Sequence, residues 1–209
     1  MPSFPDPPTT ARLPAAPEVT AAMATLADIL DPTGQTTTRI GSSALAPRRT
    51  DLSGVRLGLL ENTKHNAALL LDELAAMLQS EHGASTTVLR RTKTAFALPL
   101  PEAALDELVA ECDVVLTGVG DCGSCSASAV ADGIALERAG VPAAVICSDA
   151  FTATASGMAE VQGAPDYAYL TTAHPVAILD ADAVRERARQ LLPQVVATVT
   201  AAAPQKVAS

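Results

Sequence analysis

The stretch Asp113-Val-Val-Leu-Thr-Gly-Val-Gly-Asp-Cys-Gly-Ser-Cys-Ser126 decides the fold of this chain. It begins with a compact apolar run, which is typical of a buried strand. Glycines then lead into a segment, Ser124 to Ala139, that predicts a helix closed by Gly140. A buried strand joined to a helix by a short turn is the unit from which α/β proteins are built.

The same alternation of strand and helix extends in both directions along the chain. We expect strands at Val55–Leu60, Ser85–Leu89, Asp113–Thr117, Ala143–Cys147 and Tyr167–Thr171. We expect helices at Asn66–Gln79, Pro101–Ala110, Ser124–Ala139, Phe151–Val161 and Ala181–Val199. This pattern predicts a parallel five-stranded sheet with helices on both faces, a three-layer α/β/α domain with the flavodoxin-like strand order 2-1-3-4-5.

The chain divides into an N-terminal extension, residues 1–54, and an α/β catalytic domain, residues 55–209. Met1 to Pro17 is rich in Pro, Thr and Ala, a composition that does not bury enough apolar surface to fold. A short helix is expected at Glu18–Leu30, followed by a connector from Gln35 to Gly54.

The composition excludes several classes of protein. A net charge of −9 is the opposite of what phosphate-backbone binding needs, so no nucleic acid is expected as a partner. No run approaches the roughly 20 apolar residues of a membrane span. The N-terminus has neither the basic nor the apolar region of a signal peptide, so we expect a cytoplasmic protein without a membrane partner.

Ligands of such sheets bind beyond the carboxyl ends of the strands, where the strand order reverses. In the predicted order this point lies between the first and third strands. The loops Glu61–Asn66 and Gly118–Ser126 are therefore expected to face each other.

Two cysteines spaced Cys-x-x-Cys lie in the second of these loops. Cys122 is the candidate nucleophile, because a thiol at a helix start ionises more readily than the reference thiol, near pKa 8.5. Cys125, about one turn on, is placed to resolve an adduct by forming a disulfide. The alternative is that both merely fill a crowded helix start, as small apolar residues do. Cys112 and Cys147 are expected to be packing residues.

The composition of the same turn also bears on two other kinds of site. A zinc site would need a second Cys-x-x-Cys or a paired His motif, so no metal is expected. Gly118, Gly120 and Gly123 formally match the G-x-G-x-x-G fingerprint of dinucleotide-binding proteins. However, Asp149 lies farther along the chain than the fingerprint requires, and cysteines occupy the place of the pyrophosphate.

The motif Gly118-x-Gly-Asp-Cys-Gly-Ser-Cys125 resembles the signature of the UGSC family, whose first signature position is selenocysteine or cysteine. Leu59-Leu-Glu-Asn-Thr-Lys-His-Asn66 and Ala173-His-Pro175 support the resemblance, which covers roughly Val55 to Pro175. More distantly, the chain is similar to the selenoprotein B component of glycine, sarcosine and betaine reductases.

The resemblance implies a redox or reductive role for Cys122, with Cys125 as its partner. This chain departs from the family pattern in carrying cysteine instead of selenocysteine, which predicts a slower nucleophile. It also carries Glu61 and His65 where Asp and Pro are expected, and it adds the extension of about fifty residues.

Further site residues are expected in the facing loops. Glu61 is a candidate for moving protons, and His174, after the fifth strand, is a candidate general acid. The alternative for His174 is a loop anchor, and for the first loop a polar turn in which Asn66 caps the helix. The candidate substrate-binding residues are Asn62, Lys64, Asn66, Gly120, Asp121, Gly123, Ser124, Ser126 and Phe151.

We therefore expect a cysteine-dependent enzyme, a thiol oxidoreductase, acting on a small polar substrate without a bound cofactor. An external thiol or a reductase would restore the thiols, and a partner subunit or a second copy of the chain remains open. One alternative is a lyase or hydrolase that uses Cys122 without net redox change. Another is a small-molecule binding subunit with inert cysteines.

Overall fold

The computed structural model describes residues 45–86, 88–95 and 97–200. Contacts divide the chain into two units, Met1–Thr37 and Thr38–Ser209. The first unit lies outside the described residues, and so does the predicted helix at Glu18–Leu30. Of the predicted extension, the structure describes residues 45–54.

Five parallel strands form one sheet in the order β2-β1-β3-β4-β5, which confirms the predicted fold class. The strands are β1 (Leu57–Glu61), β2 (Val88–Thr92), β3 (Val114–Gly120), β4 (Ala143–Ser148) and β5 (Leu170–Thr172). Every residue of β3 and β4 is buried, as expected for central strands covered on both faces.

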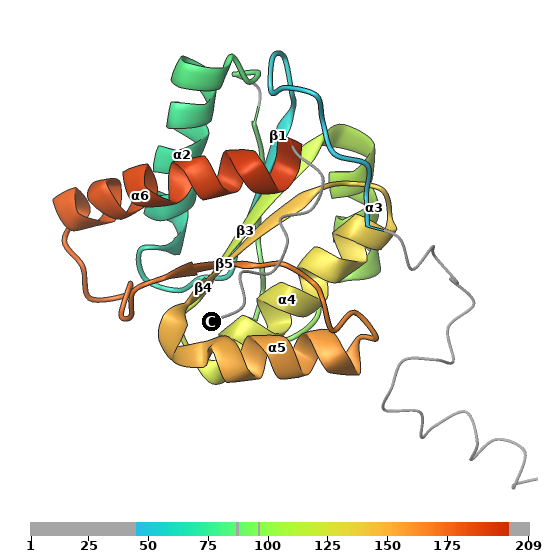
Figure 1. The fold of residues 1–209 in the computed structure, drawn as a ribbon, viewed down its shortest axis with the longest axis vertical. Coiled ribbons are helices and arrows are strands. Elements are labelled where there is room, and N and C mark those ends of the chain that lie inside the picture. Colours follow the sequence, from blue (N-terminus) through green and yellow to red (C-terminus); the bar gives the residue numbers. More distant parts are fainter. Residues whose placement is uncertain (1–44, 87, 96, 201–209) are drawn as a thin grey trace, which may run out of the picture. The chain divides into compact units, whose positions relative to one another are not determined.

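Helices cover both faces of the sheet (Figure 1). One face carries α2 (Ala67–His82) and α6 (Ala181–Thr200), and the other carries α3 (Glu102–Glu111), α4 (Gly123–Arg138) and α5 (Thr152–Val161). Along β3 the side chains alternate between the layers: Leu116 packs in the cluster with α2 and α6, and Val115 packs in the cluster with α3. None of the helices in the described part combines the length and apolar character needed to cross a membrane.

Strand β2 lies farther along the chain than the predicted strand Ser85–Leu89, and the two share only Val88 and Leu89. The prediction followed the apolar residues, whereas β2 is an edge strand whose second half is charged. Arg90 is paired with Asp72 of α2, and Arg91 is paired with Glu107 of α3. An edge strand tolerates such residues because it is only partly covered.

Strand β5 is also shorter than predicted and begins at Leu170 instead of Tyr167. Tyr167 belongs to a turn, in which its amide donates to the carbonyl of Ala164, at 2.9 Å. Its ring is 4% exposed and packs against α4 at Gly133, where any Cβ would lie 2.5 Å from the tyrosine oxygen. The aromatic residue thus fills the space between helix and sheet and does not extend the strand.

The described part of the predicted extension is tied to the α/β domain at the amino ends of the strands. The Glu137 carboxylate of α4 accepts hydrogen bonds from the amide of Ala46 (2.9 Å), the guanidinium of Arg48 (2.7 Å) and the amide of Ala143 (2.9 Å). The amide of Arg49 donates to the carbonyl of Val199 in α6. Residues 45–49 therefore bridge helices on both faces of the sheet.

Candidate functional site

The two loops expected to face each other are in direct contact at the carboxyl edge of the sheet. The side chain of Asn62, 3% exposed, forms a pair of hydrogen bonds with the backbone of Val119. Its Nδ2 donates to the Val119 carbonyl at 2.9 Å, and its Oδ1 accepts from the Val119 amide at 3.1 Å. The prediction that the loops meet is confirmed, and the amide of Asn62 is engaged in joining them.

Cys122 occupies the N-cap position of α4, with an extended backbone. Its Sγ lies 3.2 Å from the amide nitrogen of Cys125, which donates to it, and 3.6 Å from Oγ of Ser124. The structure joins Cys122 and Cys125 by a disulfide. Cys122 is partly exposed and Cys125 is 1% exposed, so the first sulfur is the one that solvent and a substrate can reach.

Helix α4 reaches this position because Gly120 has no side chain. A Cβ there would lie 2.7 Å from both Cys147 Sγ and Ser126 Oγ. Ser126 is fully buried, and its hydroxyl donates to the carbonyl of Gly120 at 3.0 Å. Gly120 and Ser126 thus hold the helix start against the sheet, while Gly123 and Ser124 lie at its more open side.

Asp121, directly before Cys122, is a buried carboxylate with many donors around it. Oδ2 accepts from the amides of Ala177 (3.0 Å) and Val176 (3.2 Å), and Oδ1 lies 2.9 Å from Nδ1 of His174. Burial by itself would raise the pKa of Asp121, but the hydrogen bonds from these amides and from His174 outweigh it. The net pKa lies below its ordinary value, so this carboxyl is ionised at neutral pH.

His174, which follows β5, is held by groups from the ends of β3 and β4. Its ring nitrogen Nδ1 contacts Asp121 after β3 and lies 3.2 Å from Oγ of Ser148, the last residue of β4. Its backbone amide donates to Asp149 at 3.0 Å. The edge of the ring meets Phe151, with ring centroids 5.2 Å apart. The side chain is 36% exposed, so it borders the solvent at this edge of the sheet.

The remaining residues of the first loop hold the loop after β5 or remain at the surface. Nδ2 of Asn66 donates to two carbonyls of that loop, at Val176 and Leu179, both at 2.9 Å, and makes no capping bond to α2. Glu61 accepts from the amide of Thr63 at 2.7 Å. The partly exposed ammonium of Lys64 has no hydrogen bond or ion pair with any other described residue. His65 contacts the carbonyl of Ala177 at 2.6 Å.

Sequence reasoning missed three polar residues at this edge. Ser148 and Asp149 follow a buried strand, and the rule that singled out the loops after β1 and β3 would have found them after β4. Lys93 follows β2 and is buried, where its ammonium contacts Ser128 Oγ (2.6 Å) and Asp132 of α4. No motif marks Lys93 in the sequence, because a buried lysine is recognised only through its partner.

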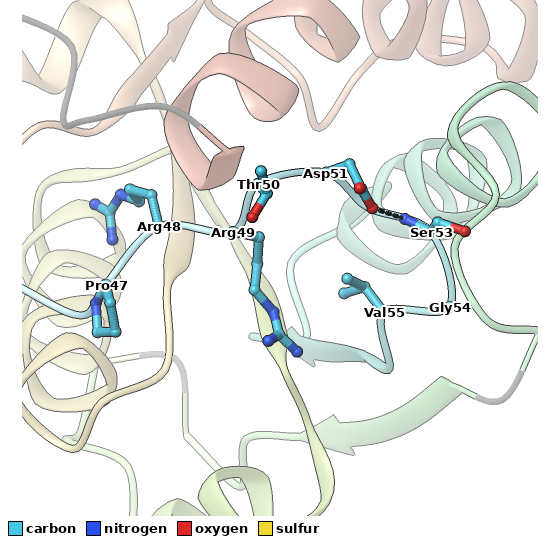
Figure 2. Close-up of a pocket in the computed structure, with 8 residues that line it drawn as sticks. All are labelled: Pro47, Arg48, Arg49, Thr50, Asp51, Ser53, Gly54 and Val55. Carbon is cyan, nitrogen blue, oxygen red and sulfur yellow. Dashed lines mark hydrogen bonds between the residues drawn. The ribbon is translucent and has the colours of Figure 1, made fainter.

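A cavity of about 350 Å³ lies away from these residues. Figure 2 shows that one stretch, Pro47 to Val55, lines it, and that Arg48 and Arg49 point to different sides of the chain. This stretch leads into β1, so the cavity lies at the amino edge of the sheet, opposite Cys122. Across the described ranges, no group of three or more His, Cys, Asp and Glu side chains is arranged to hold a metal ion.

Comparison with known proteins identifies the family. The model of the UGSC family matches residues 28–201, and the chain therefore belongs to the UGSC family. The match is wider than the stretch from Val55 to Pro175 that carries the motifs, and it includes residues 28–54. Both cysteines of the signature, Cys122 and Cys125, lie within it.

Comparisons with curated proteins and with solved structures do not extend this family assignment. No curated protein matches the sequence. One solved structure, described as a "putative Mar1 ribonuclease from Leishmania major", is similar at 12% identity over 74% of this chain and 95% of that chain. Its TM-score of 0.32 is too low to support an argument about function.

Proposed function

We propose that this UGSC family member is a thiol-dependent oxidoreductase acting on a small polar substrate, with Cys122 as the nucleophile and Cys125 as the resolving thiol. The observation that carries the proposal is the arrangement of the two sulfurs at the start of α4, within bonding distance of each other. One sulfur is accessible and the other is buried directly behind it. This arrangement suits a nucleophile and a resolving thiol.

The reaction starts from the reduced pair. The Cys122 thiolate attacks an electrophilic carbon or sulfur, X, of a bond X–Y, so that an S–X bond forms while Y leaves with the electron pair and takes up a proton. The Cys125 thiolate then attacks the Cys122 sulfur. The disulfide forms, and X leaves with its electron pair and takes up a second proton. The two thiols are oxidised and the X–Y bond is reduced by two electrons.

The surroundings of Cys122 support the first step. The amide of Cys125 donates to Cys122 Sγ, and amides at a helix start favour a negatively charged sulfur. His174, at the same edge of the sheet, is the proposed group that delivers a proton to the leaving atom. The proposed substrate contacts include Ser124, which lies against Cys122, Phe151, which packs against His174, and Lys64 of the first loop.

The cycle closes with an external thiol or a protein dithiol, which reduces the Cys122–Cys125 disulfide and is itself oxidised. No bound cofactor is part of the proposal. A cytoplasmic location fits it, because the cytosolic thiol pool keeps such a pair reduced. The distant resemblance to the selenoprotein B component of glycine reductase fits the same chemistry and is not needed for it.

The test uses bis(2-hydroxyethyl) disulfide, a small polar disulfide, as the probe. Protein reduced with dithiothreitol and freed of it is mixed with the probe, and products are mapped by mass spectrometry. We expect the wild type to end with the Cys122–Cys125 disulfide and to release two molecules of 2-mercaptoethanol. Cys125→Ser should stop at a mixed disulfide on Cys122, and Cys122→Ser should not react at this site.

Cys112→Ala is the matched control, because it removes a buried cysteine at the opposite edge and should leave these products unchanged. If Cys122→Ser reacted at the rate of the wild type, the proposed nucleophile would be wrong. If an identified substrate were turned over without loss of thiols, the result would favour the lyase or hydrolase alternative.

A further inference from the structure

We propose that Asp121 is a positioning residue for His174: it keeps the ring proton on Nδ1 and leaves Nε2 as the nitrogen that exchanges a proton beside Cys122. The inference rests on the proposed function for the role of that proton. The part of the inference that concerns the protonation state of the ring rests on the contacts of Asp121 and does not depend on the proposed function.

The assignment of the proton follows from what each partner is able to donate. An ionised carboxylate only accepts hydrogen bonds, so the 2.9 Å contact between Asp121 Oδ1 and His174 Nδ1 requires a proton on the ring nitrogen. The hydroxyl of Ser148 donates to the carbonyl of Gly120 at 3.1 Å, which leaves its oxygen to accept from the same Nδ1. A neutral imidazole with a proton on Nδ1 has its lone pair on Nε2.

The burial of the pair orients the ring. The Asp121 side chain is 2% exposed and that of His174 is 36% exposed, so the edge of the ring that carries Nδ1 faces the protein interior. The exposed part of the ring is the opposite edge, which carries Nε2. Phe151 packs edge-on against the ring and limits its rotation. Nε2 is thereby left as the ring nitrogen without these buried partners, at the sheet edge where Cys122 follows Asp121 in the chain.

The proton transfer between Cys122, His174 and the leaving atom needs no further reactant. Nε2 accepts the proton of the Cys122 thiol, which yields a thiolate and an imidazolium whose Nδ1 proton still bonds to Asp121. The imidazolium returns the Nε2 proton to Y as the X–Y bond breaks. Asp121 stays ionised throughout and stabilises the charged ring by its adjacent negative charge.

A purely structural role for Asp121 is the competing explanation, because the carboxylate also anchors the loop after β5 through the amides of Val176 and Ala177. The variant Asp121→Asn separates the two roles. Its single carbonyl oxygen is able to accept from those amides, and the amide NH2 then faces the ring. An NH2 group donates, so it should move the His174 proton from Nδ1 to Nε2.

The experiment is a ¹⁵N NMR titration of the imidazole rings in the full-length reduced protein, from about pH 6 to about pH 10, spanning the reference His pKa near 6.5. The chain has only three histidines, and substitution of each assigns its signals. We expect His174 of the wild type in the Nδ1–H form and that of Asp121→Asn in the Nε2–H form. His65→Gln, which removes another anchor of the same loop, should leave His174 unchanged.

The same variants are assayed with bis(2-hydroxyethyl) disulfide. Asp121→Asn should react at least about tenfold more slowly than His65→Gln, since general acid–base catalysis contributes roughly 10²–10⁴-fold. A wild-type His174 in the Nε2–H form overturns the inference, even if Asp121→Asn does not fold, and so does an equal change of tautomer in His65→Gln. Because the tautomer is measured without the probe, this outcome is distinct from failure of the proposed function, in which Cys122→Ser reacts normally.

Discussion

Two buried carboxylates lie at opposite edges of the sheet, and each accepts hydrogen bonds from two backbone amides and one cationic or ionisable side chain. At the amino edge Glu137 binds the amides of Ala46 and Ala143 and the guanidinium of Arg48. At the carboxyl edge Asp121 binds two amides and the ring of His174. In both arrangements, two backbone amides donate hydrogen bonds to the carboxylate.

The two arrangements differ in the side chain that forms the third hydrogen bond to the carboxylate. The guanidinium of Arg48 is permanently charged and its side chain is 9% exposed, so this pair holds residues 45–49 in place. The third partner of Asp121 is instead an imidazole, a group that is able to transfer a proton, and its side chain is 36% exposed. A buried carboxylate thus serves attachment at one edge and, on our proposal, proton transfer at the other.

The largest effect on stability is expected at the amino edge. Glu137→Ala removes the carboxylate partner of the buried charge of Arg48 and leaves two amides without this acceptor, which should lower the free energy of unfolding by about 3–5 kcal/mol. Denaturant unfolding measures this value. Glu160→Ala, at an exposed position of α5, is the control and should change it by less than about 0.5 kcal/mol. A small effect of Glu137→Ala would mean that residues 45–49 are not held by this carboxylate.

Asp121→Asn should have a smaller effect that depends on pH. Loss of hydrogen bonds to a charged acceptor should cost about 1–3 kcal/mol at neutral pH. The pKa of Asp121 is lower in the folded protein than its unfolded value near 3.9, so its ionisation stabilises the fold above about pH 4. Below about pH 4 the difference in free energy of unfolding between wild type and variant should therefore narrow as the pH falls. If the difference in free energy of unfolding instead widened in this acidic range, the lowered pKa assigned to Asp121 would be contradicted.

The smallest effect is expected in the alkylation of the two cysteines outside the motif. Burial raises the pKa of Cys112 to about 11 and that of Cys147 to about 12. In the folded, reduced protein at neutral pH, iodoacetamide should leave both unmodified, and all four cysteines should react after denaturation. Mass spectrometry counts the modified sites. Rapid native alkylation of Cys147 would show that the edge next to Gly120 opens in solution.

The architecture could be predicted from the sequence because the alternation of apolar runs and helices is unambiguous at the centre of the sheet. The edge strands could not be predicted in this way, since β2 carries Arg90 and Arg91 and depends on acidic partners in two helices. The same limit applies to Tyr167, whose place is set by the gap at Gly133. Edge elements follow from tertiary contacts that the local pattern does not contain.

For the candidate site, the sequence indicated which two loops meet at the carboxyl edge and a smaller part of the contacts that each residue makes. Asn62 and Ser126 were expected to contact a substrate, and the structure engages their side chains in hydrogen bonds within the protein. The partnership of Asp121 with His174 joins residues 53 positions apart, so no local spacing indicates it. Only the topology, which brings the ends of β3 and β5 to one edge, creates that pair.

The rate of iodoacetamide alkylation of the reduced protein, measured at each cysteine as a function of pH, tests the central proposal most directly. The account predicts that Cys122 reaches half its maximal reactivity clearly below about pH 8.5, the value of a reference thiol. Cys125, being 1% exposed, should react more slowly. If no cysteine reached half-maximal reactivity below that pH, the protein would not present a nucleophilic thiolate, and the small-molecule binding alternative would be favoured.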